Sequence, residues 1–252
     1  MNSPRTAGWI RRNNNLLYIL ATPIGNLEDI TRRALDILRS ADVILCEDTR
    51  MTRRLSDAYG LSARLVRYNE HNDQSLDSSL NFVREAKNAV LVSDSGTPCV
   101  SDPGWKLVAA ARKEGIKISS IPGPCAAAAA MAGSGLGGGG FVFLGFLPKR
   151  KARAVNAVKK ALELEKPVII YESPFRIAGL LMLLSANLPP ETETVLAREL
   201  TKIHEEWLCG TLAEVSGNIK ARQKVKGEIV LILRATDSRR EEPADENEDP
   251  DS

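Results

Sequence analysis

Two short clusters place a carboxylate beside a cation, a combination that can move a proton and hold a phosphate. In the first, Asp48 precedes Arg50 by two residues, and in the second, Glu199 precedes Lys202 by three. The carboxylate can act as a general base, and the cation can orient it or bind an anion. Surface ion pairs are the alternative interpretation. Both clusters follow predicted strands, where α/β proteins place ligand sites, and this position favours function.

A second set of candidate residues is basic. Residues 149–160 contain six Lys or Arg and no acidic residue, a density suited to phosphate contacts. A solvated helix face is the alternative, and composition does not separate the two. The basic residues that we single out are Arg53, Arg54, Lys149, Arg150 and Lys151.

Three Gly- and Pro-rich turns directly follow apolar segments that are predicted strands. Glycine lets a backbone approach a ligand closely, and the exposed N–H and C=O groups of such turns can bind its polar edges. Ordinary tight loops with Asx turns are the alternative. In open α/β sheets, ligands lie outside the carboxyl ends of the strands, so the turns are expected to wall a site. They are residues 21–26, 93–104 and 122–126.

The elements that must position these residues indicate an α/β fold with two lobes. In the first half, helix-length segments separate the predicted strands, which favours a mostly parallel sheet with both faces covered. In the second half, the spacing favours a mixed sheet. The predicted strands are residues 16–20, 43–46, 63–68, 89–92 and 116–121, then 141–146, 167–171, 192–198, 203–209 and 228–233.

Composition divides the chain further. The net charge is +2, but residues 237–252 hold eight acidic and two basic residues, a net of −6, so the remainder carries +8. The acidic segment has too few large apolar residues to order itself. Gly133, Gly135 and Gly138 match a dinucleotide-binding pattern, but they precede a predicted strand rather than open a helix, so we interpret them as a connector. The predicted parts are a basic leader 1–14, an α/β domain 15–133, a connector 134–140, an α/β domain 141–235 and a disordered acidic tail 236–252.

Other function classes are disfavoured. The four cysteines are far apart and form no Cys-x-x-Cys pair, so we expect no metal site and reduced thiols. No apolar stretch is long enough to span a bilayer, so we expect a soluble, cytoplasmic protein without a membrane partner.

Six segments together resemble one family. They are residues 18–31 (YILATPIGNLEDIT), 46–50 (CEDTR), 93–104 (SDSGTPCVSDPG), 145–150 (GFLPKR), 171–174 (YESP) and 197–202 (ARELTK). In this order they resemble the tetrapyrrole methylase superfamily, and within it the small-subunit ribosomal RNA 2′-O-methyltransferase I group. The resemblance covers roughly residues 15–234.

The resemblance implies a homodimer of two-lobed chains with S-adenosylmethionine in a cleft between the lobes. It implies methylation of the ribose 2′-hydroxyl of a cytidine in the decoding region of small-subunit ribosomal RNA. By position, the implied cofactor residues are Ile24, Ser95, Gly96, Thr97, Val100, Cys125, Ala126, Glu172 and Leu200. Two positions depart from the family pattern: Cys125 replaces the usual serine, and glycines at 137–140 replace a turn with proline and an acid.

For this reaction we hypothesise that Asp48 or Glu199 removes the hydroxyl proton, while Arg50, Arg198 and Lys202 hold phosphate or orient the carboxylates. Two alternatives use the same fold. One is a methylase of a small molecule such as a porphyrin precursor, and the other is a non-catalytic RNA-binding assembly factor. The basic segments argue against the small-molecule alternative.

Overall fold

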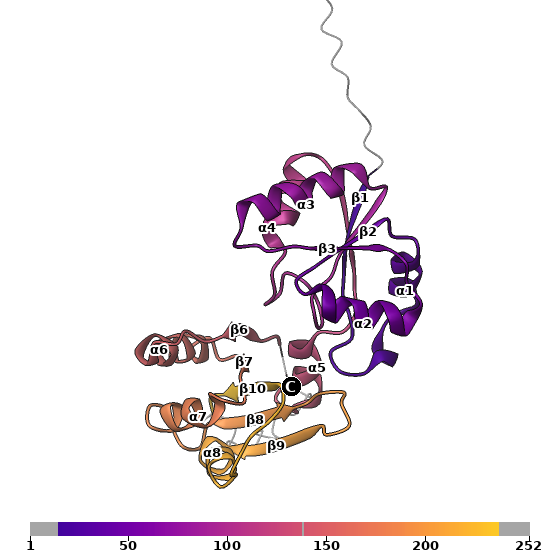
Figure 1. Cartoon of the computed structure of the whole chain (residues 1–252). Coiled ribbons are helices and arrows are strands. Elements are labelled where there is room, and N and C mark those ends of the chain that lie inside the picture. Colours follow the sequence, from indigo (N-terminus) through magenta and orange to yellow (C-terminus); the bar gives the residue numbers. More distant parts are fainter. Residues whose placement is uncertain (1–14, 138, 237–252) are drawn as a thin grey trace, which may run out of the picture. The chain divides into compact units, whose positions relative to one another are not determined.

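The computed structural model describes residues 15–137 and 139–236. Its contacts divide the chain into two compact units, and the division lies between Cys125 and Ala126 (Figure 1). The predicted basic leader, Gly138 and the acidic tail from residue 237 lie outside the described residues, so the expectations for them stay predictions.

The sheet of the first unit is parallel, with the strand order β3-β2-β4-β1-β5. Its central strands are short apolar runs, and all four residues of β2 are buried, as expected where helices cover both faces. The strands are β1 (Leu16–Leu20), β2 (Val43–Cys46), β3 (Arg64–Arg67), β4 (Asn88–Leu91) and β5 (Lys117–Ile121).

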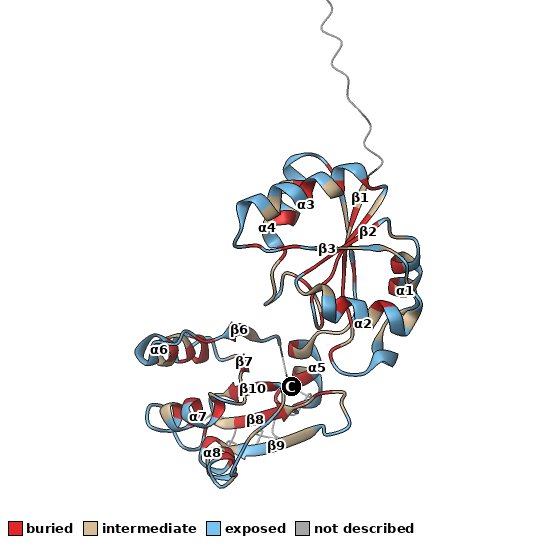
Figure 2. Ribbon diagram, viewed as in Figure 1, coloured by how far each residue is buried: buried red, intermediate tan, exposed pale blue. Residues whose placement is uncertain are grey.

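Helices cover both faces of this sheet (Figure 1). Ile44 of β2 packs with Leu38 of α1, whereas its neighbour Leu45 packs with Leu80 of α3 and Leu107 of α4. Successive strand residues point to opposite faces, so α1 lies on one face and α3 and α4 on the other. Figure 2 shows the buried residues concentrated on the strands between them. The helices are η1 (Leu27–Asp29), α1 (Arg32–Arg39), α2 (Thr49–Tyr59), α3 (Asp73–Glu85) and α4 (Trp105–Lys113).

The second unit contains a mixed sheet with the order β6-β7-β10-β8-β9, in which only the β6–β7 pair is parallel. Helices α6, α7 and α8 share one apolar core with its strands. The elements are α5 (Ala126–Gly133), β6 (Val142–Phe146), α6 (Lys151–Leu162), β7 (Val168–Glu172), α7 (Ile177–Ser185), β8 (Glu193–Arg198), β9 (Glu206–Thr211), α8 (Leu212–Lys220) and β10 (Ile229–Arg234).

Helix α5 belongs to the second unit because it packs against β7 and β10. Gly133 at its end lies against Trp207 of β9, and a Cβ there would be 2.6 Å from the indole. The division of the chain therefore precedes α5, whereas our sequence-based boundary follows it at residue 133.

The predicted fold class is confirmed: the structure has a parallel first sheet and a mixed second sheet with helices. Pro174 suits the first turn of a helix, which predicts a helix over residues 174–186. Helix α7, however, begins at Ile177, after a turn in which the amides of Arg176 and Ile177 both donate to the Ser173 carbonyl. Within the described residues, no helix is long and apolar enough to cross a membrane.

Candidate functional site

The three predicted turns meet at the carboxyl edge of the first sheet. The amide of Thr22 donates to the Gly96 carbonyl at 2.9 Å, and the amide of Gly96 donates to the Thr22 carbonyl at 3.2 Å. Thr97 Oγ1 donates to the Pro124 carbonyl at 2.9 Å. These bonds join the turns after β1, β4 and β5, which are neighbours in the sheet. The structure thus builds one continuous wall from three segments distant in sequence.

Two hydroxyls that we did not predict complete this wall. Ser93 Oγ donates to the Gly96 carbonyl at 3.1 Å, and Thr22 Oγ1 donates to the Ser93 carbonyl at 3.3 Å. Both side chains are buried. They satisfy backbone groups that would otherwise be costly to bury, so the turn keeps one conformation.

Gly96 is a point of close approach in the wall. Its φ is +82°, and a Cβ would lie 3.2 Å from Ile24 Cγ2 and 3.6 Å from the Pro124 carbonyl oxygen. Ile24 is buried against it, whereas Val100 at the far end of the same loop is 45% exposed. Of the predicted cofactor residues in this unit, Ile24, Gly96 and Thr97 are therefore brought together, and Cys125 follows Pro124 directly.

We predict that Gly96→Ala lowers the free energy of unfolding by about 1–3 kcal/mol, since alanine is strained at this φ, and also weakens cofactor binding. Gly115→Ala is the matched control, because Gly115 has φ +73° but nothing within 4 Å of a Cβ. Urea denaturation measures the first effect and calorimetry with S-adenosylmethionine the second. Equal losses of cofactor affinity in both variants would contradict a role for the Gly96 wall.

The cluster after β2 is an exposed ion pair at the start of a helix. Asp48 is the N-cap of α2: its Oδ1 accepts the Arg50 amide at 2.8 Å, and its Oδ2 accepts Arg50 Nη2 at 2.6 Å. The Arg50 side chain and amide hold the pKa of Asp48 well below its usual range. Asp48 is therefore ionised at neutral pH, but it is a weak base in this arrangement.

A third carboxylate joins this cluster from the turn after β4. Asp94 Oδ1 accepts the Asp48 amide at 3.2 Å. Burial, and secondly the charge of Asp48, raise the pKa of Asp94. The sequence indicated Asp94 only as part of a loop, because its link to Asp48 spans 46 residues.

In the second unit, Glu199 and Lys202 bind each other. Lys202 Nζ donates to Glu199 Oε1 at 2.8 Å and to Glu228 Oε2 at 3.1 Å. Burial opposes the charge on Glu199, but the bonds from Lys202 and the Glu228 amide outweigh it and lower its pKa. Position 227 beside them requires glycine, since its φ is +92° and a Cβ would overlap the Glu199 side chain. Both predicted groups are thus charged and held in place.

The backbone around Leu200 is unusual. Glu199 and Thr201 on either side of it have φ values of 53° and 65°, which non-glycine residues rarely adopt. Leu200 itself is 8% exposed. The conformation is held by the Glu199 bonds and by Glu205, whose Oε2 accepts the Thr201 amide at 2.6 Å.

Arg198, predicted to hold phosphate or orient a carboxylate, is engaged by the protein. Its Nε donates to Glu206 Oε2 at 2.8 Å, and its other nitrogens donate to the carbonyls of His204 and Lys226. Arg222 binds the same carboxylate, and the two arginines lower the pKa of Glu206 to about 2. These bonds tie β8 to β9 and to the segment before β10.

Glu172, at the end of β7, is a buried carboxylate with spare hydrogen-bonding capacity. Its Oε1 accepts the Ser173 amide at 2.7 Å. Its Oε2 is 3.2 Å from Arg176 Nη2 in an ion pair, but it accepts no hydrogen bond from the described residues. The adjacent Tyr171 hydroxyl accepts the Ala127 amide at 2.9 Å, which ties the start of α5, with Ala126, to this strand end. A donor group of a ligand would complete the Glu172 site.

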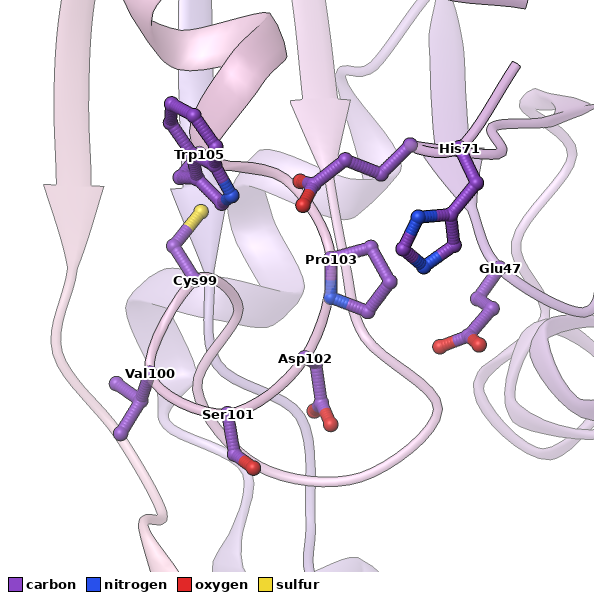
Figure 3. A pocket seen from close by; sticks show the side chains of 9 residues that line it. Glu47, His71, Cys99, Val100, Ser101, Asp102, Pro103 and Trp105 are labelled. Atoms are coloured by element: carbon purple, nitrogen blue, oxygen red, sulfur yellow. The ribbon is translucent and has the colours of Figure 1, made fainter. Parts of the chain in front are cut away.

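A cavity of about 450 Å³ lies beside the turn after β4. Figure 3 shows Trp105 and Glu47 on opposite sides of it, with Asp102 between them. His71 and Trp105 also line it, and neither was predicted as a site residue, because isolated residues of these types carry no spacing pattern.

The predicted phosphate-binding residues are exposed: Arg53 and Arg54 on α2, and Lys149, Arg150 and Lys151 at the start of α6. Within residues 15–137 and 139–236, no group of His, Cys, Asp or Glu is arranged to hold a metal ion.

Residues 16–216 match the family model of Tetrapyrrole (Corrin/Porphyrin) Methylases. Solved structures with the same fold include diphthine synthase, with a TM-score of 0.67 at 17% identity over 88% of this chain and 90% of that one. Another is the uroporphyrin-III C-methyltransferase of Thermus thermophilus complexed with S-adenosylhomocysteine, with a TM-score of 0.62 at 18% identity over 86% and 96%. The fold and the family match define a tetrapyrrole methylase.

Curated relatives narrow the family. Proteins named ribosomal RNA small subunit methyltransferase I are 42% identical in Mesorhizobium japonicum, over 91% of this chain and 78% of that protein, and 41% identical in Hydrogenobaculum sp., over 86% and 94%. The protein of that name in Escherichia coli O157:H7 is 42% identical over 91% and 81%. The chain belongs to this methyltransferase family.

Proposed function

We propose that the protein transfers a methyl group from S-adenosylmethionine to the ribose 2′-hydroxyl of a cytidine in the decoding region of small-subunit ribosomal RNA. The observation that carries the proposal is about 42% identity, over 91% of the chain, to proteins named for methylation of this RNA. We further propose that it acts in the cytoplasm as a homodimer.

The residues at the turns fit the cofactor. Gly96 lets the backbone approach a ligand, and Glu172 Oε2 offers a buried acceptor for a hydroxyl or amine. When bound, S-adenosylmethionine supplies a methyl group activated by its sulfonium charge. A structural neighbour has been solved with the demethylated product. The residues that would hold the cofactor are Ile24, Ser95, Gly96, Thr97, Val100, Cys125, Ala126, Glu172 and Leu200.

The chain's own contribution is mainly alignment of the acceptor hydroxyl. Asp48 and Glu199 are the proposed proton acceptors, with Arg50 and Lys202 as their partners. Those cations lower the pKa of both carboxylates. Transfer of the hydroxyl proton to either carboxylate therefore has little driving force in this conformation. The proposal therefore assigns more of the rate enhancement to positioning than to base catalysis.

The direct test of the reaction is mass spectrometry of ribosomal RNA nucleosides from cells with and without the protein. We expect one 2′-O-methylcytidine of the small subunit to disappear when the gene is deleted and to return with the intact gene. An unchanged nucleoside profile would contradict the proposed function.

For the base, we predict that Asp48→Asn lowers the single-turnover rate on small subunits without lowering stability, because asparagine is also a good N-cap. Asp48→Ala should lower both, since α2 loses its cap. Glu199→Gln tests the second candidate in the same assay. Full single-turnover rates in both Asp48→Asn and Glu199→Gln would exclude the two carboxylates as the base.

For RNA binding, we predict that replacing Lys149, Arg150 and Lys151 with alanine weakens affinity and reduces its salt dependence. The log–log slope should fall by about 0.7 for each phosphate of a single strand that the variant no longer neutralises. The matched control replaces Arg112, Lys113 and Lys117, three exposed basic residues at the amino ends of the strands of the first sheet, away from its predicted site. Filter binding across a salt series measures the affinity and its salt dependence for both variants. Unchanged binding in the first variant would favour a small-molecule substrate.

A further inference from the structure

The cavity in Figure 3 opens at the carboxyl ends of β2, β3 and β4, which are neighbours in the first sheet. Glu47 follows β2, His71 follows β3, residues 101–103 belong to the loop after β4, and Trp105 opens α4. The loop after β4 begins with the segment that contains Gly96. The cavity has a volume of about 450 Å³, which is within the range of small-ligand sites.

The wall of the cavity is preformed. Glu70 is buried, and its Oε2 accepts the Gly104 amide at 2.6 Å, while its carbonyl accepts Lys106 Nζ at 3.2 Å. Gly104 has φ +138°, and a Cβ there would lie 2.7 Å from both Cys99 Sγ and Leu91 Cδ2. The loop that leads into Trp105 is therefore fixed from both sides, and a ligand need not order it.

The chemistry of the lining selects a neutral, flat ligand with donor groups. Glu47 and Asp102 supply carboxylates, and the described lining residues include no Lys or Arg, so the lining favours donor groups over a phosphate. Trp105 is 58% exposed, with Lys106 Nζ 6.0 Å from the centroid of its ring, so the indole offers surface on which a flat ligand can stack. Ser101 and His71 add groups that can donate to ring acceptors.

We propose that this cavity receives the base of the target cytidine, with Trp105 stacking on the ring and Glu47 accepting a hydrogen bond from the N4 amino group. The inference rests on the proposed function and names the subsite that selects the nucleotide. Sequence-specific RNA recognition uses unpaired bases that are splayed out of their stack, and aromatic side chains compensate the lost stacking. Uracil presents an acceptor, O4, where cytosine has its amino donor, so Glu47 discriminates against it.

The surroundings of Glu47 make it a strong acceptor for such a donor. Desolvation, then the charges of Asp94 and Asp102, raise the pKa of Glu47, and the charge of Arg67 offsets them only in part. A donated hydrogen bond stabilises the negative charge of Glu47.

The test compares Trp105→Ala and Trp105→Phe on small subunits from cells lacking the protein. We expect Trp105→Ala to lower kcat/KM about 5- to 150-fold, the range that stacking of one base on an aromatic ring spans, and Trp105→Phe to restore most of it. Affinity for S-adenosylmethionine, measured by calorimetry, should not change in either variant. A parallel loss of cofactor affinity would assign the cavity to the cofactor and overturn the proposal.

The second test measures base preference with subunits reconstituted with cytidine or uridine at the target position. We expect Glu47→Gln to reduce the preference for cytidine at least about fivefold, because an amide can rotate to donate to O4. Glu85→Gln, an exposed carboxylate at the end of α3, is the control. An unchanged preference for cytidine in Glu47→Gln, together with an unchanged kcat/KM in Trp105→Ala, would overturn the proposal if the wild-type protein still methylates the subunits. Absence of methylation by the wild-type protein would instead contradict the proposed function.

Discussion

The pair of backbone hydrogen bonds between Thr22 and Gly96 is the interaction on which the site of the first unit depends. Parallel strands β1 and β4 end side by side, and this pair closes their turns into one surface. The closure requires φ +82° at Gly96, which brings its Cα against Ile24. Thr97 then reaches the Pro124 carbonyl and fixes the third turn. Without the Thr22–Gly96 pair, the turns would not be held at the positions that the other hydrogen bonds of the wall require.

The carboxylates along this edge differ in strength because their surroundings differ. Asp48 pairs with Arg50, so it stays an anion at low energetic cost. Desolvation, and then the charges of neighbouring acids, raise the pKa of both Glu47 and Asp94. The acid that is paired with an arginine therefore caps a helix, while Glu47 and Asp94 gain most from a ligand that donates hydrogen bonds. Neighbouring residues of one chemical type thus serve different purposes.

Much of the framework was predictable because it depends on local patterns. The run 43–46 is apolar and short, and it forms a buried strand; Gly96 and Pro124 mark turns that must meet, since parallel strands end at one edge. Helix α3 lies in a helix-length segment between two predicted strands, but its largely polar sequence has too little apolar periodicity to predict its bounds. The anchoring of Gly104 by Glu70 was beyond sequence pattern, because it joins residues 34 positions apart. Side-chain partners of this kind depend on the closed fold, and no spacing rule encodes them.

The charges of the first unit bear on the proposed choice of substrate. The cavity is lined by carboxylates such as Glu47, whereas the exposed cations Arg53 and Arg54 lie on α2, the helix that follows the same strand, β2. A free nucleotide would bring its phosphate to the carboxylates together with its base, and repulsion would oppose binding. In a polynucleotide, phosphates beyond the target nucleotide can contact exposed cations while the base alone enters the cavity. If the proposed function holds, this arrangement favours a base presented by RNA over the same base in a mononucleotide, because phosphate contacts supply affinity and base contacts supply specificity.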